Sequence, residues 1–192
     1  MIEPIQQQLL IERIAVLGDQ QAYKTFFQAF YKDLNRFAYS FVKSNEAAEE
    51  IVCDVFVNLW KNRIRLLEIE NLKVYLYVAV KNLSIKHTNR NSRNDLISLD
   101  ELSVEISSIG AYPNPEEICI STEIAKSIHA AIQKLPPRCK IIYKLVREDG
   151  LRYKEVADIL NLSVKTVDAQ MTIATKKICQ SMNFVLGNAE KK

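Results

Sequence analysis

Apolar residues recur every three or four positions along most of the chain, which is the spacing of one helix face. In residues 23–42 this stripe is largely aromatic, and in residues 51–60 it mixes aliphatic and aromatic side chains. The same spacing predicts further helices over residues 72–87, 116–134, 138–147, 153–160 and 164–182. The alternation typical of strands does not extend over a useful length, so the sequence predicts an all-α fold.

Local signals mark where several of these helices begin and end. Ser44 or Asn45 is a suitable N-cap, because a short side-chain oxygen can accept a hydrogen bond from a first-turn N–H group. Pro136 and Pro137 should separate the helices around them, since proline disfavours helical geometry in the residue before it. Residues 88–115 lose the periodicity and carry Asn, Ser, Asp, Gly and Pro, which indicates a linker.

These elements predict two small helical domains. The first covers residues 1–90 and the second residues 116–185, joined by a flexible acidic linker at 91–115 and followed by a tail at 186–192. The net charge of +3 is too small to argue for a nucleic-acid partner, but its distribution is uneven. Residues 71–94 and 134–147 each hold five bases and no acid, while residues 95–123 hold seven acids and no base. Each block alone could be a solvated face; two basic blocks around an acidic connector favour a nucleic-acid partner.

The cysteine pattern does not indicate a metal site. Cys53, Cys119, Cys139 and Cys179 stand far apart with no Cys-x-x-Cys pair, so we expect reduced, mostly buried thiols and no metal or other cofactor. The sequence has neither a signal-peptide pattern nor a segment approaching the roughly 18 apolar residues of a membrane span. The expected location is the cytoplasm.

A cluster of acids on one predicted helix is the feature closest to an enzyme site. Glu46, Glu49, Glu50 and Asp54 could be imagined as metal ligands. They have no histidine partner and no second cluster to complete a site, which is more typical of a partner-binding or solvated surface. We therefore predict that the protein is not an enzyme and has no small-molecule substrate.

Residues 153–167 have the spacing of a helix-turn-helix: a short helix, a three-residue turn and a second helix. Asn161 can adopt the left-handed conformation that ends the first helix, Leu162 should fill the angle between the helices, and Ser163 should cap the second. The apolar stripe of the second helix, predicted to be buried, is Val164, Val167, Met171, Ala174 and Ile178.

The opposite face of this second helix is predicted to bind DNA. Hydroxyl, amide and small apolar groups near its N-terminus suit base edges, and its lysines suit phosphates. The residues of this face are Ser163, Lys165, Thr166, Ala169, Gln170, Ile173, Lys176 and Lys177. The alternative is a plain helical hairpin of an interaction domain, with the same face merely solvated.

Residues 135–138 (Leu-Pro-Pro-Arg), 150–157 and 163–167 closely resemble region 4 of the extracytoplasmic-function (ECF) sigma factors. Residues 46–60 resemble region 2.2 of the same family, and residues 75–83 resemble the regions that open the promoter. The resemblance extends from about residue 23 to 178, and the motifs are similar to versions common in the Bacteroidetes expansion of the family. It implies a factor that binds core RNA polymerase and directs promoter-specific transcription initiation, with region 2 recognising the minus-10 element and region 4 the minus-35 element.

The resemblance also implies roles for the first domain. In the family, the second helix of region 2 binds the clamp coiled coil of the largest polymerase subunit, and the matching residues here are Asp54, Asn58, Leu59 and Trp60. For Trp60, the alternative is a core aromatic that packs against residues 23–42.

In the family, the third helix and the loop before it capture the unpaired non-template strand of the minus-10 element. The helix residues in question are Lys73, Lys81, Asn82, Lys86 and Arg90, and residues 63–71 would form the loop that pockets a flipped base. Tyr75 or Tyr77 could stack on bases if they face outward; the alternative places both in the core.

Further partners follow from the resemblance alone. Family members are often inhibited by an anti-sigma factor, commonly membrane-tethered, and the acidic linker matches a segment that threads the RNA-exit path, with a plain spacer as the alternative. Gln170 stands where many members have arginine or histidine, so the minus-35 sequence preference does not transfer. The rival hypothesis is a regulator that dimerises through its first domain and binds duplex DNA without polymerase.

Overall fold

The computed structural model describes residues 4–91 and 118–189 of the 192-residue chain, with side chains described for residues 8–89 and 126–181. Within these ranges the chain is helical apart from short connections and contains no strand, which confirms the all-α prediction. The chain divides into two compact units, residues 1–97 (unit 1) and 98–192 (unit 2). The predicted linker lies almost entirely in residues 92–117, outside the described residues, so the domain limits stay a prediction.

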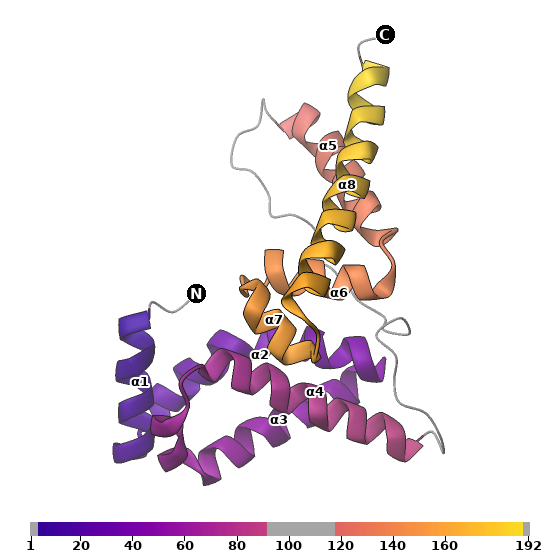
Figure 1. The fold of residues 1–192 in the computed structure, drawn as a ribbon. Helices are drawn as coiled ribbons and strands as arrows, with labels where there is room; N and C mark the ends of the chain where they lie inside the picture. The colour runs from indigo at the N-terminus through magenta and orange to yellow at the C-terminus, as the bar shows by residue number, and fades with distance from the viewer. Residues whose placement is uncertain (1–3, 92–117, 190–192) are drawn as a thin grey trace. The chain divides into compact units, whose positions relative to one another are not determined.

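Unit 1 is a bundle in which α2, α3 and α4 pack against one another (Figure 1). The shorter α1 lies where α2 begins and also contacts the 3-10 helix η1, which joins α3 to α4. The bounds are α1 Pro4–Leu17, α2 Gln20–Val42, α3 Asn45–Lys61, η1 Arg63–Glu68 and α4 Leu72–Asn91. The helix α1 was not predicted, and α3 begins six residues earlier than its apolar stripe.

Capping side chains fix the beginnings of the long helices in unit 1. Asp19 caps α2, and the hydroxyl of Ser44 caps α3 by accepting a hydrogen bond from the N–H of Ala47 at 3.2 Å. This confirms the prediction that Ser44 or Asn45 caps the helix. Between the two helices, Lys43 takes the left-handed conformation with φ of 55°, and its N–H donates to the carbonyl of Tyr39 at 2.9 Å.

Aromatic side chains make up much of the core of unit 1. Phe26 and Phe37 are fully buried, and Phe56 and Tyr77 nearly so. The rings of Phe26 and Phe56 join α2 to α3 with centroids 6.0 Å apart, and those of Phe37 and Tyr77 join α2 to α4 at 5.0 Å. Burying one such side chain contributes about 1.5–3 kcal/mol, so the predicted aromatic stripe of residues 23–42 is the main apolar seam of this unit.

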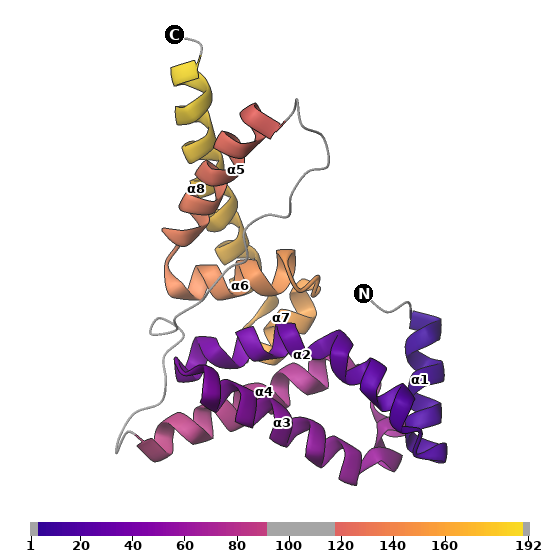
Figure 2. The same cartoon turned by 180° about the vertical axis from the view of Figure 1, so that it is seen from behind.

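Unit 2 is built around one long helix, α8, which α5, α6 and α7 all contact (Figure 2). The bounds are α5 Ile118–Gln133, α6 Pro137–Arg147, α7 Tyr153–Leu160 and α8 Val164–Ala189. The proline pair separates α5 from α6 as predicted, with Pro137 in the first turn of α6, where a missing N–H group costs nothing.

A buried ion pair closes the turn between α6 and α7. The ammonium group of Lys144 donates to both carboxylate oxygens of Asp149, at 2.9 and 2.8 Å, and both side chains are almost wholly buried. Gly150 follows with φ of 65°, a conformation that favours glycine. The basic block of residues 134–147 is therefore not one solvated face, because one of its five bases is inside the unit.

The cysteines are less buried than predicted. Cys139 is buried, and its thiol donates to the carbonyl of Gln170 at 3.3 Å, but Cys53 and Cys179 are exposed. The expectation of mostly buried thiols is therefore wrong for these two, and the side chain of Cys119 lies outside the described residues. Among the described residues, no group of His, Cys, Asp and Glu could hold a metal ion, and no helix is long and apolar enough to cross a membrane.

Candidate nucleic-acid interface

Helices α7 and α8 form the predicted helix-turn-helix. Val156 and Ala157 hold α7 against the rest of unit 2, and both are buried. Asn161 ends α7 in the left-handed conformation, with φ of 55° and ψ of 48°, as its side chain allows. The N–H of Leu162 donates to the carbonyl of Ala157 at 2.9 Å, which completes the turn. A side-chain carboxylate also secures the start of α7, since Glu155 accepts from the N–H of residue 152 at 2.7 Å.

Ser163 caps α8, as predicted. Its hydroxyl oxygen accepts a hydrogen bond from the N–H of Thr166 at 3.0 Å and lies 2.8 Å from the Thr166 hydroxyl. The two hydroxyls at the start of α8 are therefore hydrogen-bonded to each other in the free protein. A base edge or phosphate that hydrogen-bonds to one of these hydroxyls therefore competes with the capping hydrogen bonds of α8.

The face of α8 that packs on unit 2 is the predicted stripe with one exception. Val167, Met171, Ala174 and Ile178 are buried, whereas Val164 is 46% exposed. Side chains tilt toward the N-terminus of their helix, so the first residue of α8 projects past the helix end instead of onto the unit. The prediction that Val164 is buried is therefore wrong.

The opposite face of α8 is accessible. Ser163, Lys165, Ala169, Ile173, Lys176 and Lys177 are exposed, and Thr166 and Gln170 are half-buried. These residues lie along one side of α8 from its first turn onward, with the hydroxyl and amide groups near the N-terminus and two lysines farther along. This is the arrangement that a helix needs to place small polar groups at base edges and cations at flanking phosphates.

In unit 1, the predicted DNA-binding row on α4 is only partly accessible. Asn82 and Lys86 are exposed and Lys73 is half-buried, while the side chain of Arg90 lies outside the described residues. Lys81 is buried, at 8% exposure, and this burial lowers the pKa of its ammonium group because desolvation disfavours the charge. The prediction that Lys81 lies along a DNA strand is therefore corrected, because its side chain packs into unit 1.

The two tyrosines of α4 take opposite positions. Tyr75 is 46% exposed, and Tyr77 is buried against Phe37. They are two residues apart, so they cannot share one face of a helix. Tyr75 is thus available for stacking on a base, and Tyr77 belongs to the core.

The loop predicted at residues 63–71 contains the 3-10 helix η1. Leu66 anchors it in the core, and Ile64 and Leu67 are exposed apolar side chains on its surface. At its end the side-chain oxygen of Asn71 accepts from the N–H of Val74 at 3.1 Å, which begins α4. The segment is therefore a short ordered element with an exposed apolar surface.

The predicted polymerase-binding residues of α3 divide between surface and core. Asp54 and Asn58 are exposed, but Leu59 is 4% exposed. It continues the buried stripe of Val55 and Phe56 at helical spacing, so the prediction of Leu59 as a contact residue is wrong.

Trp60 packs against α2, as the core alternative predicted, and its role as an interface residue stays a prediction. Its ring packs against Tyr23 of α2, with centroids 4.8 Å apart, and the guanidinium group of Arg63 lies 5.4 Å from the ring centroid. The side chain nevertheless stays half-exposed. The hydroxyl of Tyr23 donates to the carbonyl of Phe56 at 2.5 Å, and burial raises the pKa of Tyr23 to about 12.

Trp60 also lines an open apolar pocket between α2 and α3, which the sequence did not predict. The pocket has a volume of about 460 Å³. Its lining residues are Gln20, Tyr23, Phe27, Cys53, Phe56, Val57, Trp60 and Lys61. The sequence feature that could have indicated the pocket is the number of aromatic residues on α2, which is larger than one buried helix face requires.

Two family models match the chain, one in each unit. The Sigma-70 region 2 model matches residues 26–94, and the Sigma-70, region 4 model matches residues 125–178. The ECF RNA polymerase sigma-E factor of Escherichia coli strain K12 is 24% identical over 183 residues, covering 93% of this chain and 95% of its own length. The RNA polymerase sigma-H factor of Pseudomonas aeruginosa is 22% identical over 194 residues, covering 98% and 100%.

Two solved structures share the fold. One is CnrH in complex with the cytosolic domain of CnrY, with a TM-score of 0.54 and 18% identity, covering 93% of this chain and 97% of that one. The other is the sigma factor RpoE of Bartonella quintana in complex with the anti-sigma factor NepR, with a TM-score of 0.51 and 19% identity, covering 84% and 96%.

Proposed function

Since this chain belongs to the ECF group of the sigma-70 family, we propose that unit 2 binds duplex DNA at the minus-35 element and that unit 1 binds core RNA polymerase and the single-stranded minus-10 element. Promoter-specific transcription initiation is the function of this family, and core polymerase and promoter DNA are its partners. The proposal concerns which residues of this chain make the contacts.

The observation that carries the proposal is the geometry of α7 and α8. A left-handed Asn161, a capped α8 and a buried inner stripe leave one face of α8 free from its first turn onward. Lys165 and Gln170 are placed for the major groove, where the amide can read a base edge and the ammonium can bind phosphate. Lys176 and Lys177 extend the cationic side along the helix.

In unit 1 the DNA-binding set is smaller than the sequence predicted. Asn82 and Lys86 are the exposed members of the α4 row, and Lys73 is partly accessible. Tyr75 supplies an exposed ring on the same helix. Cations along the backbone combined with one ring for stacking are what holds a single strand of DNA. Residues 63–71 supply the surface that reads the displaced base.

The polymerase contact is proposed for Asp54, Asn58 and Trp60. The first two are exposed on α3, and Trp60 offers a half-buried ring that lines the apolar pocket. A large aromatic side chain with a pocket beside it is the usual energetic centre of a protein interface. Charged and amide groups around such a centre set orientation and specificity.

An anti-sigma factor is a further proposed partner, since both structural neighbours were solved in complexes, one of them with an anti-sigma factor. We also propose that the protein works in the cytoplasm, where its polymerase partner acts, and that it has no enzymatic activity of its own. The acidic linker near the RNA-exit path and the likeness to Bacteroidetes sequences stay predictions.

The test is transcription from genomic fragments by bacterial core RNA polymerase with the purified full-length protein. New start sites that depend on the protein are expected. Lys165→Ala should weaken duplex binding at all sequences and reduce the salt slope of affinity by about one, as expected for a lost phosphate contact. Its matched control is Lys32→Ala, which removes the same charge at an exposed position on α2, outside α7 and α8 and outside both basic blocks.

Asp54→Ala tests the polymerase contact. It should lower the affinity for core polymerase while duplex binding is unchanged, and Glu12→Ala, an exposed acid on α1, is its control. If core polymerase neither binds the protein nor initiates with it while duplex DNA is still bound, the proposal fails and the free-standing regulator replaces it.

A further inference from the structure

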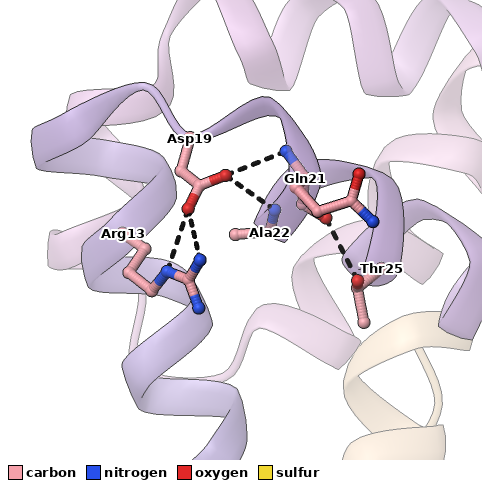
Figure 3. A network of polar contacts seen from close by, with 5 residues as sticks. All are labelled: Arg13, Asp19, Gln21, Ala22 and Thr25. Atoms are coloured by element: carbon pink, nitrogen blue, oxygen red, sulfur yellow. Dashed lines mark hydrogen bonds and ion pairs between the residues drawn. The ribbon is translucent and has the colours of Figure 1, made fainter.

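The corner between α1 and α2, formed by Arg13, Gly18 and Asp19, precedes the region 2 match, which begins at residue 26. Gly18 turns the chain with φ of 61°, a conformation that costs glycine little. One oxygen of Asp19 accepts from the N–H groups of Gln21 and Ala22, at 2.9 and 3.0 Å. The other accepts from Nε and Nη2 of Arg13, at 2.9 and 2.5 Å (Figure 3). A single carboxylate thus ties the two helices together.

Helix α1, which the corner joins to α2, packs against η1 and supports it. Ile11, Ile14 and Ala15 of α1 are buried, and α1 contacts η1 as well as α2. On the side of η1, the buried residue is Leu66. The segment proposed to read the minus-10 element therefore rests on α1, and its position depends on where the corner holds that helix.

Arg63, the first residue of η1, lies between the corner and the end of α3. A Cβ atom on Gly18 would stand 3.6 Å from Nε and 3.8 Å from Nη2 of Arg63, so the guanidinium group lies against the corner. Its carbon Cζ is 5.4 Å from the centroid of the Trp60 ring. A planar, delocalised cation is suited to such packing on an aromatic face.

The position of the Arg63 side chain against Gly18 and Trp60 is not explained by a hydrogen bond from its Nε atom. Nε of Arg63 is buried and has no hydrogen-bond partner. A buried donor without a partner costs free energy, so the position is kept in spite of this atom, through packing on Gly18 and Trp60. One side chain thereby touches the corner, the end of the proposed polymerase-binding helix and the start of η1.

We propose that Arg63 is a positioning residue for minus-10 readout. It fixes the start of η1 between the corner and Trp60, and this sets the exposed side chains of Ile64 and Leu67 at a defined place for the unpaired strand. The inference rests on the proposed function of residues 63–71. It requires no contact between Arg63 and DNA, because selection among bases depends on a reading surface held to within about 0.5 Å.

The test uses the full-length protein with core polymerase at saturating concentration, on a promoter fragment recovered with the wild-type protein. Each minus-10 position carries each of the four bases in turn, and the ratio of transcription rates between the preferred base and the others is measured. Arg63→Met keeps the stem and removes the planar cation. Lys32→Met removes a charge of the same sign at an exposed position on α2, outside residues 63–71, and is the matched control.

Arg63→Met should lose roughly tenfold of the discrimination at the flipped base, within the range for one mismatched position, while affinity for duplex minus-35 DNA is unchanged. Lys32→Met should keep the ratio even where it lowers the rate. A ratio that stays within about twofold of wild type in Arg63→Met overturns the proposal. The proposal is also overturned if Arg63→Met and its control lose the same amount of transcription rate while the ratio between bases stays constant. Such a result would show that only the positive charge matters.

A second variant covers loss of folding. If Arg63→Met melts unit 1 below the assay temperature, Gly18→Ala is used, which strains the left-handed corner without changing charge. The same loss of discrimination is expected, and an unchanged ratio again overturns the proposal. Failure of the wild-type protein to initiate with core polymerase would contradict the proposed function itself, and it is seen before any variant is compared.

Discussion

The buried pair of Lys144 and Asp149 gives the sharpest prediction for stability. Both side chains are almost fully buried, and two hydrogen bonds of 2.8 and 2.9 Å join them. Lys144→Met keeps the volume of the stem but leaves a buried carboxylate without its ammonium partner. Breaking such a pair from one side costs about 3–5 kcal/mol, a large part of the total stability of a small domain.

The assay is urea unfolding of the full-length protein followed by two signals. Trp60 is the only tryptophan of the chain, so fluorescence reports unit 1, whereas far-ultraviolet circular dichroism reports both units. With a slope of about 2 kcal/mol per M, Lys144→Met should lower the midpoint of the unit 2 transition by about 2 M. The fluorescence transition should not move. Lys134→Met, at an exposed position, should change stability by less than about 0.5 kcal/mol.

The double variant Lys144→Met with Asp149→Asn separates charge from packing. It has no buried charge at this position, so it should be more stable than Lys144→Met alone by about 1–3 kcal/mol. A cost below about 1 kcal/mol for Lys144→Met would refute the reasoning. The reasoning would also be refuted if the double variant were no more stable than Lys144→Met alone. The loss of stability would then come from the packing of the lysine stem and not from the buried charge.

Three further outcomes are expected. Ser163→Ala should destabilise unit 2 by about 1 kcal/mol through loss of the α8 cap, measured by urea unfolding, and a cost near zero would contradict the cap. The pKa of Asp19 is lowered by hydrogen bonds from the N–H of Ala22 and from Arg13, so it stabilises the folded state above the unfolded-state pKa near 4. Unit 1 should therefore lose stability as the pH falls below about 4, and Asp19→Asn should flatten this part of the Trp60 fluorescence profile. Maleimide should label Cys53 before Cys139 in the native protein, because Cys139 is buried and burial raises the pKa of its thiol; equal rates by mass spectrometry would contradict this.

Periodicity predicted most of the helices, including α4, whose apolar residues are not confined to one face, but it missed α1. In α1 the buried Ile11 and Ile14 share the helix with the exposed Leu9, Val16 and Leu17, so no single apolar face stands out in the sequence. The helix-turn-helix was predictable because its turn and cap are local: Asn161 and Ser163 act within a few residues of their own positions.

One error at the site came from tertiary packing that local sequence does not contain, and another came from preferring the family resemblance to the local spacing. Lys81 is a cation whose burial depends on how α4 packs against its neighbours, and Lys144 finds its partner five residues later, across a turn. For Leu59, family resemblance indicated a contact, whereas its spacing from Val55 and Phe56 indicated the core, and the spacing was correct. The pocket beside Trp60 exists only once α2 and α3 are packed.

In the proposed duplex complex, two large exposed apolar side chains in the described part of α8 affect how the binding free energy depends on salt and temperature. Val164 and Ile173 are each more than two-fifths exposed in the free protein, and thymine methyl groups are the apolar features of the major groove. Covering them releases water instead of counterions, so this share of the binding free energy persists at salt concentrations that weaken the lysine contacts. It also gives duplex association a negative heat-capacity change, which makes calorimetry at several temperatures a measure of how closely α8 approaches the bases.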